Sequence, residues 1–184
     1  TLEKGSDNAV SGGDSYQTTD TDALDAAIYS VKDLTLNGAG SLDVTSDKGN
    51  GIKTVDDLVI TGGVINIDAA NDALRGRDSI AIKSGTFTLT AGGDALQANN
   101  DEDVTKGWIS IDGGTYTIDS TGAGLKAESL LQINDGTLDI NSDDDALHSN
   151  TNMRVAGGNI KINAGDDALH ADSLLNILDG TIKV

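Results

Sequence analysis

The sequence contains no cysteine and no proline, and aromatic residues make up only 3% of it. Without cysteine there is neither a disulfide framework nor a thiolate metal site. Nor is there an apolar run of bilayer length, so we expect no membrane insertion. Glycine, by contrast, occurs 23 times. Turns must therefore be made by Gly, Asn and Asp rather than by proline.

Basic residues are also scarce, with 12 Lys and Arg against 30 Asp and Glu and a formal net charge of −18. Such a chain is poorly suited to neutralise phosphate, so nucleic acid and anionic membranes are poor partners, and we expect neither nucleic-acid binding nor membrane insertion. The charge points instead to divalent cations, or to self-repulsion that is tolerated because it keeps the protein soluble. Some acidic chains are disordered, but the regular recurrence of apolar residues here argues against disorder.

The clearest internal repeat is an Asp-Ala-Leu motif, seen in TDALD (21–25), NDALR (71–75), GDALQ (93–97) and DDALH (144–148 and 166–170). We call the apolar residue of each repeat its anchor. The anchors are Leu24, Ile52, Leu74, Leu96, Leu125, Leu147 and Leu169, separated by 28, 22, 22, 29, 22 and 22 residues. The chain is therefore built from a unit of 22 residues with two insertions, the larger at 99–107.

Each unit alternates apolar and polar residues around a glycine, as in GTFTLT (85–90) and GTLDIN (136–141). This period of two indicates strands, two clear ones per unit with the anchor segment as a third. We predict an all-β, right-handed parallel β-helix of about seven coils. Residues 1–184 would form one domain, with 1–20 an N-terminal extension or cap and 99–107 a loop insertion. The last unit ends midway through a coil, so we expect end-to-end contact with further coils or domains.

Acidic residues precede the anchors and would stack in columns about 4.8 Å apart. Two residues before each anchor stand Asp22, Asn50, Asp72, Asp94, Ala123, Asp145 and Asp167. Carboxylates so close repel one another, and Ca²⁺, which takes six to eight oxygen ligands, would offset the repulsion. The richest candidate cluster is Asp143, Asp144, Asp145, Asp166 and Asp167, and a second comprises Asn71, Asp72 and Asp94. The alternative is that Asp and Asn simply make turns through side chain–backbone hydrogen bonds.

A row of mostly cationic residues follows the anchors by one position. After Asp25 it comprises Lys53, Arg75, Gln97, Lys126, His148 and His170. With the anchors pointing inward, this row points outward, and the Ala or Gly before each anchor would let a flat polymer approach. Such a face suits an acidic polysaccharide. Alternatively, the cations only compensate the acidic column on a solvated face.

Two further features concern histidine and the aromatic residues. His148 and His170 are interpreted as neutral donors rather than zinc ligands, because two histidines alone make a poor closed site. Phe87 and Tyr116 are expected to stack in the core. Trp108 is either a stacking platform for a sugar ring or packed beneath the 99–107 loop.

The 22-residue coils and the stacked NDALR, GDALQ and DDALH turns resemble a known family. These are calcium-binding, right-handed β-helix carbohydrate-binding domains of bacterial surface proteins, similar in fold to pectate lyases. The resemblance runs from about residue 23 to the end, and GAGLK (122–126) departs from it. It implies calcium in the Asp turns, binding of acidic or cellulosic plant cell-wall polysaccharide, and an extracellular or cell-surface location.

Two other functions remain open. A calcium-dependent polysaccharide lyase would need a base, for which Lys126 and Lys53 are candidates, but neither accompanies the densest acidic cluster. The chain could also be a structural stalk of a surface adhesin. We expect a non-catalytic binding domain.

Overall fold

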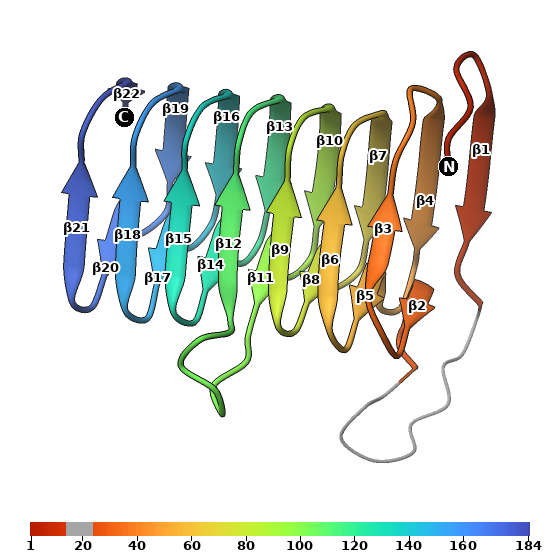
Figure 1. The fold of residues 1–184 in the computed structure, drawn as a ribbon, viewed down its shortest axis with the longest axis horizontal. Helices are drawn as coiled ribbons and strands as arrows, with labels where there is room; N and C mark the ends of the chain where they lie inside the picture. The colour runs from red at the N-terminus through yellow and green to blue at the C-terminus, as the bar shows by residue number, and fades with distance from the viewer. Residues whose placement is uncertain (14–23) are drawn as a thin grey trace.

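The computed structural model describes residues 1–13 and 24–184, and its described residues form a parallel β-solenoid of about seven coils (Figure 1). Three parallel sheets run along the solenoid, each taking one strand from every coil. Equivalent anchors pair across coils, as Leu74 does with Leu96 and Leu147 with Leu169. The predicted parallel β-helix with a period of 22 residues is therefore confirmed. The described residues contain no helix, and so none able to span a bilayer.

The strands fall into three sets. The first sheet contains β1 (Asp7–Ser11), β4 (Ser41–Ser46), β7 (Val64–Ala69), β10 (Thr86–Ala91), β13 (Thr115–Ser120), β16 (Thr137–Ser142), β19 (Asn159–Ala164) and β22 (Thr181–Lys183). The second contains β2 (Ala26–Ser30), β5 (Asn50–Thr54), β8 (Leu74–Gly76), β11 (Leu96–Ala98), β14 (Leu125–Ala127), β17 (Leu147–Ser149) and β20 (Leu169–Ala171). The third contains β3 (Leu34–Leu36), β6 (Asp57–Ile60), β9 (Ser79–Ile82), β12 (Trp108–Ile111), β15 (Leu130–Ile133), β18 (Asn152–Val155) and β21 (Leu174–Ile177).

The core lies inside the coils and is built by the alternation seen in the sequence. In β10, Phe87 and Leu89 are each 1% exposed, whereas the threonines that alternate with them are exposed. Phe87 stacks on Tyr116 one coil later, with ring centroids 4.7 Å apart and planes 4° from parallel. The Tyr116 hydroxyl donates to the carbonyl of Gly113 at 2.9 Å, which satisfies its one polar group. The expected aromatic core stack is present.

The first coil departs from the predicted register. Ile28, not Leu24, pairs with Ile52, and Tyr29, not Asp25, pairs with Lys53. Leu24 is 46% exposed, whereas Ile28 packs against the core. The motif TDALD was therefore the wrong guide here, because burial of Ile28 decides the register. Asp22 and the predicted turn around it lie outside the described residues.

We predicted that residues 1–20 flank the coils and that residues 99–107 interrupt them. The first segment contributes a strand to a sheet, and the second is a loop. Within 1–20, β1 pairs with β4 and adds the eighth strand to the first sheet. Residues 99–107 connect β11 to β12 and extend away from the coils (Figure 1). The last described coil leaves Leu174 and Ile177 more than half exposed. End-to-end contact remains a prediction.

The small residues before the anchors lie inside the solenoid, which corrects the expectation that they form a surface strip. Ala73, Ala95 and Ala146 are 0% exposed. A Cβ at Gly51 would lie 2.4 Å from the Ile67 side chain. Because the chain bends just before each short strand of the second sheet, two consecutive residues face inward there. Their small size is needed for packing rather than for access by a polymer.

Candidate functional site

The predicted outward row forms a continuous ladder on the second sheet. Neighbouring members pair strand to strand, in the order Lys53, Arg75, Gln97, Lys126, His148 and His170. Each side chain is half-buried, while the anchor before it points into the core. The short strands β5, β8, β11, β14, β17 and β20 therefore present six polar side chains in one line.

The acidic column beside this ladder is held by hydrogen bonds between coils. Asp72 Oδ1 accepts the backbone N–H of Asp94 at 3.0 Å, and Asp145 Oδ1 accepts that of Asp167 at 2.8 Å. Asn50 Oδ1 does the same for the N–H of Asp72 at 3.1 Å. Each side chain thus satisfies a backbone donor at the bend of the next coil. This need explains why Asp and Asn recur there.

The second oxygen of each carboxylate faces the ladder residue three positions later. Arg75 lies 3.3 Å from Asp72 Oδ2, and His148 Nδ1 lies 2.6 Å from Asp145 Oδ2. Gln97 Nε2 donates a hydrogen bond to Asp94 Oδ2 at 2.5 Å. Arg75 and His148 therefore compensate the charge of the acidic column at their coils, as the alternative interpretation of the sequence proposed, whereas Gln97 only donates a hydrogen bond. Within the set Asn71, Asp72 and Asp94, both carboxylates already have partners in the protein.

The environment of the column shifts two carboxyl groups in opposite directions. Burial raises the pKa of Asp72, and the hydrogen bond from Asp94 and the charge of Arg75 only partly offset it. Burial also acts to raise the pKa of Asp145, but hydrogen bonds from His148 and from the Asp167 backbone outweigh it, so the pKa is lowered. The charged form of Asp145 is thus the better stabilised of the two.

Lys126 breaks the pattern of compensation. Three residues before Lys126 the acidic column contains Ala123. Every other ladder residue from Arg75 to His170 has an aspartate at that distance before it. In the described part of the chain, the side-chain ammonium group of Lys126 has no hydrogen bond or ion pair, while that of Lys53 is held by Asp25 at 2.7 Å. The ladder therefore carries one uncompensated ammonium group, between Gln97 and His148.

Three of the five acids in the richest predicted cluster converge. Asp144, Asp145 and Asp166 each place a carboxylate oxygen within 4.8 Å of the others. Asp145 is buried, whereas Asp144 and Asp166 are exposed. Asp143 and Asp167 lie outside this set. Three carboxylates at one bend can supply oxygen ligands to a hard cation such as Ca²⁺.

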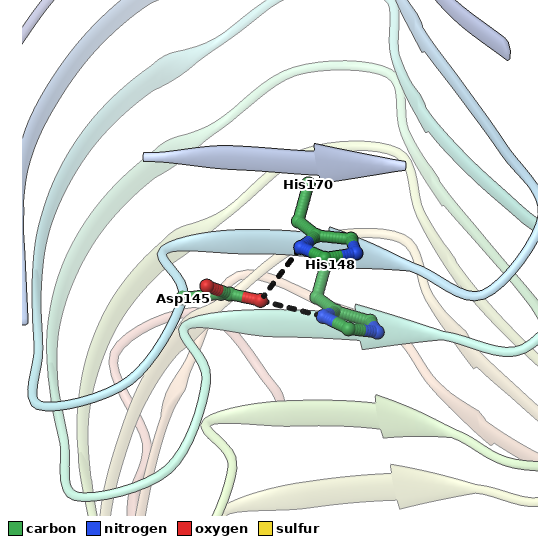
Figure 2. Close-up of side chains that lie close together, drawn as sticks. All are labelled: Asp145, His148 and His170. Atoms are coloured by element: carbon green, nitrogen blue, oxygen red, sulfur yellow. Dashed lines mark hydrogen bonds and ion pairs between the residues drawn. The ribbon is translucent and has the colours of Figure 1, made fainter. Parts of the chain in front are cut away.

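A second group joins the same aspartate to both histidines (Figure 2). Asp145 Oδ2 lies 2.6 Å from His148 Nδ1 and 3.7 Å from His170 Nδ1. The two rings stack, with centroids 4.7 Å apart. Sequence reasoning did not foresee that both histidines face one carboxylate. The signal was available, since DDALH repeats at the coil period.

Trp108 does not join the ladder. It begins β12 on the third sheet, where it pairs with Ser79 and Leu130 and is half-buried.

A shallow cavity of about 330 Å³, which the sequence did not predict, lies beside the 99–107 loop and is lined by residues such as Asn100, Val104, Glu128 and Asn152. The base of the loop is fixed by Asp78, which accepts from Lys106 and from Asn100, each at 2.6 Å.

Comparisons with known proteins fit this architecture. A "Carbohydrate-binding domain-containing protein" of Acetivibrio thermocellus is 40% identical over 70 residues, which are 37% of this chain and 24% of that protein. A solved structure, described as the polysaccharide lyase-like protein from C. thermocellum in a gadolinium derivative, superposes with a TM-score of 0.71 at 30% identity. That similarity covers 98% of this chain but 66% of the solved one. The chain thus spans less than two thirds of either relative.

The family described as carbohydrate-binding domain-containing protein matches residues 1–184, the whole of the sequence. The solenoid, the polar ladder along its second sheet and this match over the full length agree. The chain belongs to the family of carbohydrate-binding domain-containing proteins.

Proposed function

We propose that this chain is a non-catalytic module that binds acidic plant cell-wall polysaccharide, such as polygalacturonate, along the ladder of the second sheet. We place it in the extracellular space or on a bacterial surface. The observation that carries the proposal is the uncompensated ammonium group of Lys126, in a chain whose family is named for carbohydrate binding. In a protein with a net charge of −18, such a group is a specific place for a carboxylate to bind.

The neighbours of Lys126 suit a sugar chain. Gln97 and His148 flank it on adjacent coils, and successive coils are about 4.8 Å apart. An extended polymer lying along the solenoid axis would meet an amide, an ammonium group and an imidazole in turn. The Gln97 amide can bond to a hydroxyl group while the ammonium group binds the uronate carboxylate, and the His148 ring, whose nitrogens are both held by protein groups, offers a flat contact surface.

Calcium enters the proposal as a stabiliser of the last coils. Asp144, Asp145 and Asp166 are the acids brought closest together, and their mutual repulsion would be relieved by a divalent cation.

The second candidate function is a polysaccharide lyase, favoured by the similarity to the solved structure that is described as polysaccharide lyase-like. A calcium-dependent lyase needs a metal beside its base. The coil of Lys126 has Ala123 in place of the acid, and Lys53 is ion-paired with Asp25. This arrangement supports binding over elimination.

The test is retention on insoluble polygalacturonate, comparing Lys126→Ala with Lys161→Ala. Lys161 is the matched control, an exposed lysine on the first sheet paired with Asp139. We expect Lys126→Ala to reduce retention at least fivefold and Lys161→Ala to leave it unchanged. Equal retention of both variants would remove the ladder from the proposal. Unsaturated uronate products in the same assay would instead establish the lyase.

A further inference from the structure

We propose that Asp145, His148 and His170 form a binding site for a transition-metal ion of the Zn²⁺ class, which shares Asp145 with the calcium cluster but differs from it in ligand chemistry. The site lies at the outer surface of β17 and β20, where the two DDALH repeats stack (Figure 2). The inference stands independently of the proposed polysaccharide binding.

The ligand set is one carboxylate oxygen and two imidazole nitrogens. Asp145 Oδ2 is 2.6 Å from His148 Nδ1 and 3.7 Å from His170 Nδ1, and one atom from each residue lies within 4.8 Å of the others. Ligands of a tetrahedral zinc ion, at about 2.0–2.1 Å from the metal, are roughly 3.3 Å apart. The carboxylate–imidazole distances bracket that value. Because the rings are stacked, with planes 16° from parallel, both must rotate about χ2, a soft torsion in histidine, and leave the stacked arrangement for the two Nδ1 atoms to bind one ion.

The other nitrogen of each ring is already held as a donor. His148 Nε2 lies 2.7 Å from Asn150 Oδ1, and Asn150 in turn donates its amide to Glu128 Oε2 at 2.7 Å. His170 Nε2 lies 3.0 Å from Asp172 Oδ1. Because both partners are acceptors, Nε2 carries the hydrogen in each ring. Without a metal, His148 Nδ1 donates a hydrogen to Asp145 Oδ2, and His170 Nδ1 faces carboxylate oxygens in the same way. A bound metal ion would take the place of the Nδ1 hydrogens while each Nε2 keeps its own.

Metal-binding histidines are oriented in this way. The ring nitrogen opposite the metal typically donates to a carboxylate or an amide oxygen, which fixes the tautomer. Two histidines alone would be a poor zinc site, but Asp145 supplies a third ligand, and two histidines with one carboxylate leave an open position for water. Asp167 Oδ2, 3.1 Å from His170 Nδ1, is a neighbouring oxygen for that position.

The ligand chemistry selects the metal. Imidazole nitrogen favours Zn²⁺, Ni²⁺ or Cu²⁺, whereas Ca²⁺ takes oxygen ligands. In two earlier coils the position equivalent to His148 holds another residue: Arg75 pairs with Asp72, and Gln97 pairs with Asp94. Those coils keep the bridging aspartate but have no imidazole. The metal site is therefore confined to the two last ladder positions.

Titration of the apo protein with ZnCl₂ tests the proposal by calorimetry and by ¹⁵N NMR of the imidazoles. The chain has two histidines, so each ring signal can be assigned with one variant. We expect one Zn²⁺ per chain, with both Nδ1 resonances shifted and both Nε2 protons retained. Excess CaCl₂ should not displace it.

His148→Gln and His170→Gln should each weaken zinc binding at least tenfold. Asp94→Asn, which changes the equivalent aspartate of a coil without histidine, should bind zinc as the unsubstituted chain does. Asp144→Asn with Asp166→Asn should retain zinc binding too, which separates this site from the calcium cluster. Undisturbed Nδ1 resonances in the unsubstituted chain, or unchanged affinity in the histidine variants, would overturn the proposal. The NMR result needs no variant to fold.

Discussion

Asp94 Oδ1 accepts the backbone N–H of Ala123 at 2.7 Å, so the carboxylate of one coil is hydrogen-bonded to the next coil at the position where that coil has no carboxylate. The acidic column is thus a chain of bonds from side chain to backbone rather than a stack of free charges. It is interrupted after Ala123, and the interruption leaves Lys126 without an acid.

The role of the column as a hydrogen-bond acceptor can be separated from its charge. Asp94→Ala leaves the N–H of Ala123, a fully buried residue, without its partner, and should lower the free energy of unfolding by about 1–3 kcal/mol. Asp94→Asn keeps the acceptor oxygen and can still pair with Gln97, so it should cost much less. Urea denaturation measures both. Equal losses would mean that the negative charge is what the fold requires.

Supplying the missing acid should weaken polysaccharide binding. In Ala123→Asp the new carboxylate would face Lys126, as Asp72 faces Arg75 at 3.3 Å. We expect retention on polygalacturonate to fall severalfold while the melting temperature holds. Ala123→Asn is the uncharged control and should bind nearly as the unsubstituted chain does. Full retention by Ala123→Asp would contradict the role given to the free ammonium group.

Calcium should raise the melting temperature through the acids of the last coils. At a concentration 100 times the dissociation constant, an ion that binds only the folded state adds about 2.7 kcal/mol. For a chain of this size that corresponds to roughly 5–10 °C. The double substitution Asp144→Asn and Asp166→Asn should abolish the calcium-dependent increase, measured by calorimetric scans with calcium and with chelator. Asp143→Asn, outside the converging set, should keep it.

The ion pair at the base of the 99–107 loop should give a defined pH dependence. Burial alone would raise the pKa of Asp78, but hydrogen bonds from Lys106 and Asn100 outweigh it and lower the pKa below its ordinary value of 3.8. A lowered folded-state pKa means that the ionised group stabilises the fold above the unfolded value, and that this stability is lost as the pH falls through the folded value.

Asp78→Asn should therefore lower the melting temperature by a few degrees at pH 7. The difference from the unsubstituted chain should shrink as the pH falls below about 4, where the unfolded chain becomes protonated. Melting curves from pH 7 to pH 3 measure it. A difference in melting temperature that stays constant with pH would show that the packing of the Asp78 side chain, and not its negative charge, stabilises the fold.

Removing one ring of the aromatic stack should destabilise the middle coils. Phe87→Ala takes away a side chain that is 1% exposed and contacts Tyr116, and such changes cost about 3–5 kcal/mol. Tyr116→Phe loses only the bond to the Gly113 carbonyl and should cost about 1 kcal/mol. Thermal unfolding should rank Phe87→Ala well below Tyr116→Phe, and the reverse order would refute the packing described for these coils.

The sequence by itself determined the coil period, the strand alternation and the inward anchors from Ile52 to Leu169. These features depend on local patterning: apolar side chains that alternate with polar ones must face one side of a strand, and a repeat of 22 residues must stack. The same patterning placed Lys126, His148 and His170 in one outward line.

Only the tertiary structure decided the features that depend on contacts between coils. Burial of Ile28 set the register of the first coil against the misleading TDALD motif, and tight packing placed Ala73 and Ala95 inside. The direction of each carboxylate also depended on the next coil, because its partner is a backbone N–H 22 residues away for Asp72 and Asp145 and 29 residues away for Asp94. A linear sequence does not state which donor lies above which acceptor, and that is why Asp145 and the two histidines came together only in three dimensions.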